Sequence, residues 1–443
     1  MPTMHESDVL VVGGGPAGAT VATLLADRGW SVSLVEREHH PRFHIGESLL
    51  PMNLPIFERL GVLDEVSAIG VRKAGADFAA PGHCGYVRYP FAHALRDTPS
   101  FAFHVRRSEL DELLFRNAVE HGASGHEGVT IQRLRVAEEG VVADGLGAGR
   151  RAHRFVARYL VDASGRGTLA GRQLGVRKRL PHRKSAALFA HYRDVLPTPD
   201  DDLGNICIHR IQRGWVWLIP LRGGLTSIGV VCDPNVIGHG GRDRLEALVE
   251  AAPSIAQRLG DARMVGEART ASNYSYRHDR AAGPRWIMVG DAFGFLDPVF
   301  SSGVFMAMRG AELAAEVVDC ALRAPSREAA LQRDYAAAIE DALDTFQWFV
   351  DHFNSDAMDL LFQQPNNSGQ IVQAIISMLA GDVADQGVRR RLLAFKAIFA
   401  ATKLDILRIR MMDAITGRAT WHSLVRDASL RTFVPDEAAK SDA

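Results

Sequence analysis

One short segment near the start of the chain limits the choice of fold more than any other. The six residues Gly13–Gly18 fit the pattern G-x-G-x-x-G, between an apolar run at Val9–Val12 and a helical pattern at Ala17–Arg28. A strand, a glycine turn and a helix in this order begin a βαβ unit, which a predicted strand at Ser31–Val35 completes. The sequence therefore predicts an α/β chain that opens with a Rossmann-type dinucleotide fold.

The residues of this motif have separate tasks. Gly13 permits the tight turn, Gly15 lets the backbone approach a pyrophosphate, and Gly18 lets the helix pack closely on the strand. The helix N-terminus, which includes Ala17, presents unpaired N–H groups to phosphate. Glu36 ends the second strand, where its carboxylate can accept hydrogen bonds from ribose hydroxyls. The alternative is a glycine turn without a ligand, as we predict for the polar hairpin that contains Gly145, Gly147 and Gly149.

The composition excludes several classes of protein. The 443 residues are 47% hydrophobic and 23% charged, which is typical of a globular chain with two or three domains. Because 51 basic residues nearly balance 52 acidic ones, we expect no nucleic-acid partner. No basic region precedes the first apolar strand, and no run of about eighteen apolar residues occurs, so we expect a cytoplasmic protein without an integral membrane segment.

No motif for a metal site is present. The cysteines have no C-x-x-C spacing, and neither H-E-x-x-H nor a cluster of two histidines and a carboxylate occurs. We therefore predict no metal, and cysteines that are reduced and mostly buried. These cysteines are Cys84, Cys207, Cys232 and Cys320.

The rest of the chain alternates between helical and strand-like patterns. Two helices and two strands that return toward the first sheet are predicted at Leu54–Ala68, Ser108–Glu120, Val129–Arg135 and Phe155–Val161. From about Gly171 to Asp233 apolar positions recur with a period of two, which is typical of a separate antiparallel sheet. A buried strand, a long alanine-rich helix and a mostly helical remainder follow at Trp286–Val289, at Gly303–Leu322 and after Pro325.

A second group of residues bears on whether the dinucleotide is a flavin. Asp291 follows a buried strand, where its carboxylate could hold a ribityl hydroxyl. The helix N-terminus at Gly303 and Val304 would present N–H groups and a positive dipole end to flavin N1 and O2, which favours an anionic reduced flavin. A Gly-Asp pair is common in proteins, so this feature alone leaves the choice open.

Taken together, these residues resemble a known family. Five motifs between roughly residues 8 and 320 are similar to those of group A flavoprotein monooxygenases and their relatives. The resemblance implies FAD as the cofactor, lined by Ser48 and Arg107, with Arg37 among its contacts and Asp291 at its ribityl chain. The motifs are Gly13–Gly18 with Glu36, Gly46–Ser48, Arg107 in VRRSELD, Asp162–Arg166 and Gly290-Asp291.

Three further features resemble the flavin-dependent halogenase branch, which includes the tryptophan halogenases. The segment Gly214–Pro220 matches the branch motif GWxWxIP, and Phe295–Gly303 matches its flavin loop FxxPxxSxG. Lys73 aligns with the lysine that these enzymes use to hold or carry hypohalous acid. The resemblance places Pro298 and Ser302 at the flavin, and it places Trp215, Trp217 and Phe300 in the substrate cavity.

The resemblance implies an oxidoreductase in which reduced FAD and oxygen form a C4a-hydroperoxide. Halogenation of an indole, phenol or pyrrole, free or tethered to a carrier protein or peptide, is the leading hypothesis. The alternatives are hydroxylation of an aromatic group, such as a peptide-borne tryptophan, a flavin reductase resembling geranylgeranyl reductases, and a flavin-binding protein without turnover. A single dinucleotide fingerprint suits a separate flavin reductase as partner, although some relatives bind NADPH themselves.

The absence of a Gly/Ser linker predicts interleaved domains. An FAD-binding domain is expected from residues 1–80, 101–170 and 271–325, and an antiparallel substrate domain from residues 81–100 and 171–270. A helical C-terminal region, residues 326–443, is expected to cover the active site.

Several of these residues have a structural interpretation as well. Lys73 could hold hypohalous acid, or form a haloamine if its pKa were lowered, but it could also be a solvated lysine beside Arg72. Trp215 and Trp217 point to one face of a strand, where they either pack or wall a cavity. No sequence spacing pairs a histidine with a carboxylate, which favours surface or core positions for His191, His209 and His278.

Two clusters remain without an assigned role. A basic stretch is either a solvated face or a docking site for an acidic carrier protein; its residues are Arg172, Arg177, Lys178, Arg179, Arg183 and Lys184. Aromatic residues in the C-terminal helices are either core or part of the substrate site; they are Phe346, Trp348, Phe349, Phe353 and Phe362.

Overall fold

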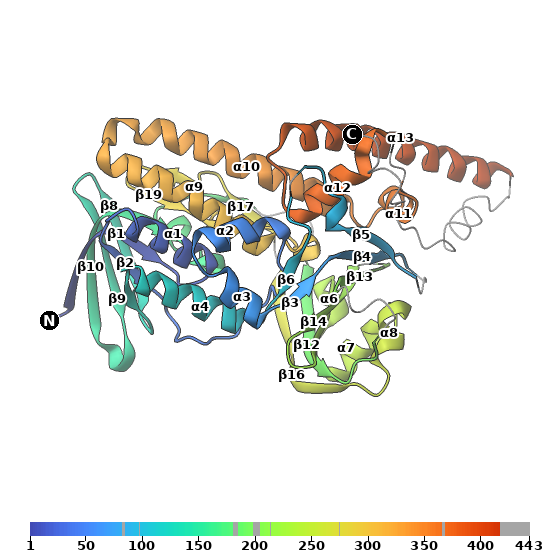
Figure 1. Ribbon diagram of the computed structural model, residues 1–443, viewed down its shortest axis with the longest axis horizontal. Coiled ribbons are helices and arrows are strands. Elements are labelled where there is room, and N and C mark those ends of the chain that lie inside the picture. Colours follow the sequence, from blue (N-terminus) through green and yellow to red (C-terminus); the bar gives the residue numbers. More distant parts are fainter. Residues whose placement is uncertain are drawn as a thin grey trace. The chain divides into compact units, whose positions relative to one another are not determined.

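The computed structural model describes residues 1–81, 85–96, 98–179, 185–197, 204–212, 214–273, 275–365 and 368–416. The chain forms two compact units, each assembled from three stretches of sequence (Figure 1). The first unit comprises Met1–Gly70, Val105–Lys184 and Tyr274–Gln347. The second comprises Val71–His104, Ser185–Asn273 and Trp348–Ala443.

An eight-stranded sheet forms the centre of the first unit. Its strands β19, β10, β1, β2 and β7 lie side by side and run parallel, which confirms the predicted Rossmann-type fold. The strands are β1 (Thr3–Val12), β2 (Val32–Val35), β7 (Ser124–His126), β8 (Thr130–Ala137), β9 (Gly140–Leu146), β10 (Ala152–Asp162), β18 (Ala282–Gly283) and β19 (Trp286–Met288). A separate small sheet contains β11 (Lys178–Arg179), β17 (Tyr276–His278) and β20 (Gly294–Phe295).

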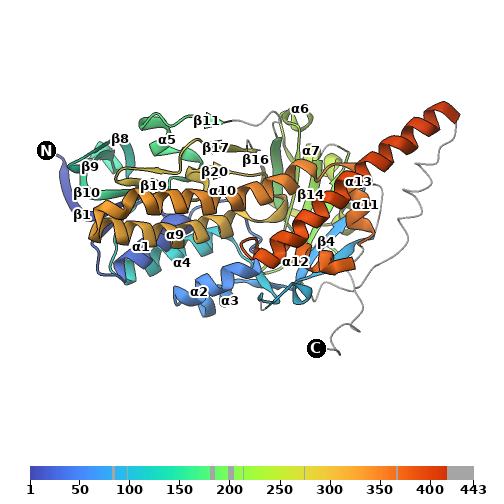
Figure 2. The ribbon, with the colours of Figure 1, turned by 90° about the horizontal axis from the view of Figure 1, so that it is seen from above.

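Helices pack on this sheet through small and apolar side chains. Helices α9 and α10 lie side by side in both views (Figures 1 and 2), and the Tyr335 hydroxyl of α10 donates to the carbonyl of Met288 at 2.6 Å. The predicted helix over Leu54–Ala68 is two helices, because Gly61 takes a positive φ of 71° between them. The helices are α1 (Pro16–Ala26), α2 (Leu54–Arg59), α3 (Leu63–Ile69), α4 (Arg107–Glu120), α5 (Leu169–Gln173), α9 (Gly303–Arg323) and α10 (Glu328–His352).

The second unit contains a seven-stranded sheet in the order β16-β12-β15-β14-β13-β4-β5. All neighbouring strands are antiparallel except β13 and β4, which pair in parallel. Its strands are β4 (Gly75–Ala79), β5 (Val87–Pro90), β12 (Ser185–Arg193), β13 (Ile206–Ile211), β14 (Gly214–Leu221), β15 (Leu225–Cys232) and β16 (Arg263–Asn273). Two short strands, β3 (Val71–Lys73) and β6 (Ala102–His104), pair separately.

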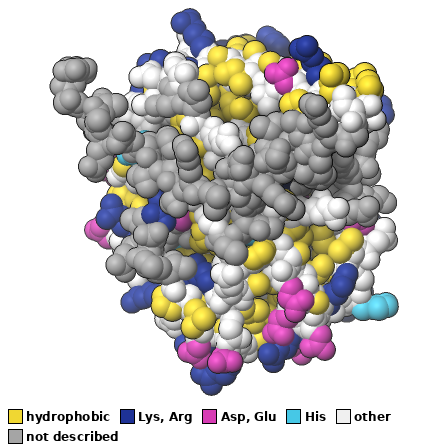
Figure 3. Space-filling model, turned by 90° about the vertical axis from the view of Figure 1, so that its right-hand side faces the viewer, with side chains coloured by type: hydrophobic (Ala, Val, Ile, Leu, Met, Phe, Trp, Pro, Cys, Tyr) yellow, Lys and Arg dark blue, Asp and Glu magenta, His cyan; other side chains and the backbone are white. Residues whose placement is uncertain are grey.

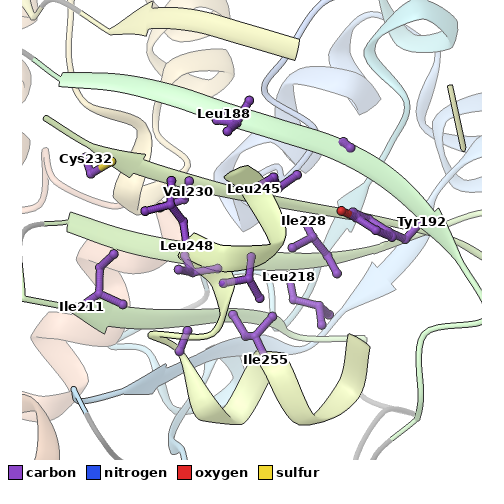
Figure 4. Packing of buried hydrophobic residues seen from close by; sticks show 14 of the residues in the cluster. Leu188, Tyr192, Ile211, Leu218, Ile228, Val230, Cys232, Leu245, Leu248 and Ile255 are labelled. Atoms are coloured by element: carbon purple, nitrogen blue, oxygen red, sulfur yellow. The ribbon is translucent and has the colours of Figure 1, made fainter. Parts of the chain in front are cut away.

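One face of the seven-stranded sheet carries a hydrophobic core. Alternate residues of β12, β14 and β15 meet α7 (Arg242–Val249) and α8 (Pro253–Leu259), as the period of two requires (Figure 4). Leu218, Ile228 and Val230 from the strands pack with Leu245 and Ile255 from the helices. This core buries about ten large side chains and so fixes which residues of β14 point to the opposite face.

The opposite face of the sheet is aromatic. Phe78 of β4 contacts the rings of Tyr89, Phe353 and Phe362, with centroids 5.3–6.1 Å apart. The Tyr89 hydroxyl donates to the carbonyl of Phe362 at 2.9 Å, which fastens α11 to this unit. The remaining helices of the unit are α6 (Pro234–Ile237), α11 (Asp356–Gln363), α12 (Ile371–Ala380) and α13 (Gln386–Thr416).

The two compact units do not follow the predicted domain bounds everywhere. Strands β3, β4 and β6 belong to the second unit, because β4 pairs with β13 and β5. Residues 171–184 belong to the first unit, since β11 pairs with β17. The C-terminal helices divide within α10, between Gln347 and Trp348.

Candidate functional site

The glycine turn of the first unit is closed by backbone contacts that leave no room for side chains. A Cβ on Gly18 would lie 1.8 Å from the carbonyl oxygen of Gly13, and one on Gly13 would lie 2.1 Å from that of Ala163. Gly13 also has a φ of 110°, which favours glycine. The Glu36 carboxylate accepts from the N–H of Gly14 at 2.7 Å, so it fixes the turn. The turn is thus shaped as the motif predicts.

The outer side of this turn is open and lies beside Arg42, whose guanidinium pairs with Asp111 at 2.9 Å and lies 3.5 Å from the Glu36 carboxylate. Among the described residues, and apart from its neighbours in the chain, a Cβ on Gly15 would have only the guanidinium Nη2 of Arg42 within 4 Å, at 3.5 Å. Helix α1 begins there without a side-chain cap or an acidic residue in its first turn. Arg42 is a residue that sequence reasoning missed, because no spacing connects it to the motif. Arg37 is exposed instead, and its guanidinium pairs with Glu38 at 3.3 Å.

Arg107 is held rigidly at the start of α4. Its guanidinium donates to both carboxylate oxygens of Asp111 at 2.8 and 3.1 Å, and to the carbonyl of Ile45 at 3.0 Å. Its charge lowers the pKa of His44 to about 4, together with burial. Ser48, three residues after Ile45, is buried in the same unit. Asp111 and the Ile45 carbonyl together hold the Arg107 side chain in one position within the first unit.

The second open helix terminus belongs to α9. Pro298–Phe300 form a short 3₁₀ turn in which the Asp297 carboxylate accepts from the N–H of Val299, while Phe300 is buried. Ser302 precedes α9 but its side chain does not cap it, and no acidic residue lies in the first turn. In the part of the chain that the structure describes, a Cβ on Gly303 would have no atom within 4 Å outside its chain neighbours and the backbone of its own helix. The first N–H groups of α9, including that of Val304, therefore remain available for an anionic group.

Asp291 completes this part of the first unit. Surrounding protein raises its pKa to about 6, although the charges of Arg107 and Arg166 act in the opposite direction. Hydrogen-bond donors such as ribityl hydroxyls would stabilise the charged form of this carboxylate. Two uncapped helix termini, an open glycine turn with Arg42 and this carboxylate together fit FAD.

Lys73 lies in the second unit and is not solvated. Its side chain is 1% exposed, and burial lowers the pKa of its ammonium to about 7. Nζ lies 5.2 Å from the centroid of the Phe91 ring. Its neighbour Arg72 is exposed and stacks on Phe101, because alternate residues of β3 point to opposite sides. The structural alternative for Lys73, a solvated side chain, is therefore wrong.

His104 is a second buried group beside this lysine, and sequence reasoning missed it. Its Nε2 lies 2.9 Å from the carbonyl oxygen of Gly204, so Nε2 carries the proton, and its buried Nδ1 has no hydrogen-bond partner among the described residues. Burial and the charge of Lys73 hold the pKa of His104 well below its usual value. Gly204 fits here because a Cβ would lie 1.9 Å from the carbonyl oxygen of Arg72.

Trp215 and Trp217 point to the aromatic face of the sheet, as their spacing predicts. Both are buried, and their ring centroids are 5.5 Å apart. The Trp217 indole N–H donates to the Ser227 hydroxyl at 3.1 Å, and its ring also contacts Phe189. These contacts agree with the packing interpretation. Their role in a substrate cavity remains a prediction.

The other candidates lie outside these two groups of residues. The His209 Nδ1 is hydrogen-bonded to the Ser254 hydroxyl, and the His278 Nδ1 donates to the carbonyl of Phe293. His191 is partly exposed. The described residues contain no cluster of three potential metal ligands and no helix long and apolar enough to cross a membrane. Cys207 and Cys232 are buried and Cys320 is partly buried, and none of the three forms a disulfide among the described residues. Cys84, Arg183 and Lys184 lie outside the described residues.

Comparison with known sequences gives consistent results. Residues 6–337 match the model of the FAD binding domain family. Tryptophan 2-halogenase from Chondromyces crocatus is 36% identical over 72% of this chain, which spans 62% of that protein. The pyrrole-2-carbonyl peptidyl-carrier protein brominase of Pseudoalteromonas luteoviolacea is 31% identical, with 73% of this chain and 79% of the brominase aligned. The corresponding chlorinase of Pseudomonas fluorescens is 28% identical over 97% of this chain and 99% of its own.

Solved structures show the same similarity. A flavoprotein/dehydrogenase from Cytophaga hutchinsonii has a TM-score of 0.84 at 26% identity and covers 90% of this chain and 100% of its own. The flavin-dependent brominase Bmp2 has a TM-score of 0.78 at 26% identity, with 89% and 99% covered.

Proposed function

Because this chain belongs to the flavin-dependent halogenases, which are FAD enzymes, we propose that it halogenates an electron-rich aromatic ring presented on a carrier protein. One observation carries the proposal: the second unit buries the Lys73 ammonium and lowers its pKa to about 7. The pyrrole-2-carbonyl carrier-protein halogenases support the tethered substrate, since one of them aligns over nearly the whole of both chains.

The cofactor would be held by the first unit. The Gly13–Gly18 turn and Arg42 would bind the pyrophosphate, Asp291 the ribityl chain, and the N-terminus of α9 the flavin ring. Bound FAD, once reduced by a partner reductase or by the enzyme itself, would supply the two electrons that activate oxygen, so that a halide becomes hypohalous acid.

Lys73 is the residue to which we assign the electrophilic halogen. An amine with a pKa of about 7 is roughly half neutral at neutral pH, and the neutral form has a lone pair. That lone pair attacks the halogen of hypohalous acid, the oxygen–halogen bond breaks, and hydroxide leaves as water with a proton from the nitrogen. The aromatic ring then takes the halogen and returns a proton to the amine.

The test uses FAD-loaded protein with a flavin reductase, NADH, oxygen and a pyrrole-2-carbonyl-loaded carrier domain, with chloride or bromide. We expect a halogen isotope pattern on the acyl group that disappears in Lys73→Ala and in Lys73→Arg, while FAD content stays unchanged. Arginine keeps a positive donor but never presents a neutral amine. An active Lys73→Arg would refute the haloamine step and leave a hydrogen-bonding role.

The hydroxylase alternative gives a different mass. A product that gains one oxygen and is insensitive to halide would exclude halogenation. Turnover that reduces an alkene without oxygen would instead indicate a reductase.

A further inference from the structure

Helix α13 is apolar on two opposite faces. Its inner face packs into the second unit through five buried residues, which are Val388, Leu392, Phe395, Phe399 and Ile406. Its outer face also carries large apolar side chains, and Leu404, Met411 and Ile415 are 62%, 65% and 76% exposed. Hydrophobic side chains reach the surface at the top of Figure 3, at the height of α13 in Figure 1. Ordinary surface helices carry only one apolar face.

Five of the seven exposed large apolar residues of α13 lie along one stripe; the other two, Ile398 and Met412, project outside it. At 100° per residue the five project within about 80° of one another, opposite the buried face. The stripe extends over about 33 Å at the helical rise of 1.5 Å per residue. We call it the α13 stripe; its residues are Leu393, Leu404, Leu407, Met411 and Ile415. An exposed apolar surface of this length is typical of an interaction site.

The charges beside the α13 stripe are basic. Arg390 and Arg408 project from one side of it, and Lys396 and Lys403 from the other. Arg408 also lies 3.9 Å from the Asp405 carboxylate, and the Lys396 ammonium lies 4.9 Å from the centroid of the Trp348 ring. Of the two acidic residues of α13, Asp405 lies next to Arg408 and Asp413 lies farther round the helix, so the flanks keep a net positive charge. Methionine and leucine with flanking basic residues therefore present an apolar surface that complements an acidic partner.

We propose that the α13 stripe is the docking surface for the acidic carrier domain that delivers the substrate, an inference that rests on the proposed function. A second copy of this chain fits less well, because pairing two stripes would bring like charges together. An anionic membrane surface would also attract these basic residues, so the experiment includes a vesicle-binding measurement that distinguishes a membrane from a carrier domain. The basic stretch at Arg172–Arg179 is the competing surface on this chain, although Arg179 pairs with Asp279 and Lys178 lies over the Tyr276 ring.

The experiment compares two substrates of the same chemistry. Wild-type protein and a Leu407→Glu/Met411→Glu variant receive either pyrrole-2-carbonyl carrier domain or the pyrrole-2-carbonyl thioester of N-acetylcysteamine. We expect KM for the carrier substrate to rise about tenfold or more with kcat nearly unchanged, and kinetics with the small thioester to stay at the wild-type level. Lys403→Glu/Arg408→Glu should raise KM as well, and added salt should reduce the difference.

Controls make each outcome decisive. Ile398→Glu places the same charge at a 41% exposed apolar site off the stripe and should leave both substrates unaffected. Unchanged carrier kinetics in the stripe variant, or a KM effect only in Arg172→Glu/Arg177→Glu, would overturn the proposal. So would loss of a dimer in light scattering, or loss of binding to phosphatidylglycerol vesicles, caused by the stripe variant. If wild-type protein halogenates neither substrate, the proposed function fails, while direct titration of the loaded carrier still tests the surface.

Discussion

Lys73 and His104 lie on two paired strands and share one buried environment. Val71 is opposite His104 in the register of β3 and β6, so Lys73, two residues on, is the diagonal neighbour of His104 on the same face. The carbonyl of Gly204 accepts the Nε2 proton of His104, and the charge of Lys73 disfavours a second proton. The fold therefore keeps the imidazole neutral next to an amine that titrates near pH 7.

Lys73→Met should stabilise the protein in a pH-dependent way. Folding lowers the pKa of Lys73 from 10.5 to about 7, so the unfolded chain binds the extra proton between these values. Burying the charged lysine therefore lowers the stability of the fold by its full amount below about pH 7, and this loss of stability diminishes as the pH rises toward 10. We expect Lys73→Met to raise the free energy of unfolding by on the order of 5 kcal/mol at pH 6, and by less at pH 9, in urea titrations. The exposed neighbour Arg72 provides the control, since Arg72→Met should give no such trend.

His104→Phe should destabilise the fold by about 1–3 kcal/mol, because it leaves the buried Gly204 carbonyl without a donor. His104→Gln, whose amide can donate to the same oxygen, should recover most of this loss. The pKa of His104 is lowered in the folded protein, so its contribution to stability is present above about pH 6.5 and is lost as the pH falls below it. Chemical denaturation at pH 5 and pH 7.5 measures both effects. Equal losses of stability in His104→Phe and His104→Gln would contradict the role of the hydrogen bond to Gly204, and a loss in His104→Phe that is the same at both pH values would contradict the pH dependence.

Two glycines should respond differently to alanine. Gly18→Ala places a Cβ 1.8 Å from the Gly13 carbonyl oxygen and should abolish both the turn and FAD binding. The Cβ of Gly303→Ala meets no described atom within 4 Å outside its own stretch of helix, so the apoprotein should keep its melting temperature. If α9 presents its first N–H groups to the flavin, the added methyl group should still weaken FAD affinity by about tenfold. Fluorescence titration of FAD, beside thermal melts of the apoprotein, separates the two effects.

Asp291→Asn should stabilise the apoprotein and weaken FAD binding. The folded pKa of about 6 lies above the usual 3.8, so the carboxylate costs stability that develops as the pH rises from 4 to 6. At pH 8 the apoprotein of Asp291→Asn should melt higher than wild type, and FAD should bind about tenfold more weakly because an anionic acceptor is lost. Unchanged FAD affinity would show that Asp291 does not contact the cofactor.

The sequence by itself determined the cofactor fold. Gly13, Gly15 and Gly18 lie between a strand and a helix, and local geometry leaves such a turn one conformation, so spacing alone was sufficient. Helix and strand types also followed from local periodicity, because the buried face of an element repeats with its own period. The helix break at Gly61 and the additional length of β1 were not apparent from pattern.

Only the tertiary structure decided the environments of charged groups. A lysine at position 73 has the same local sequence whether it is solvated or buried; pairing of β3 with β6 and the close approach of Gly204 to Arg72 bury it beside His104. In the same way, Arg42 reaches the Gly15 turn from 27 residues further along the chain, and the packing of Val388–Ile406 on the second unit decides which apolar residues of α13 stay exposed. Burial and charge proximity depend on contacts between distant segments, and no local pattern contains them.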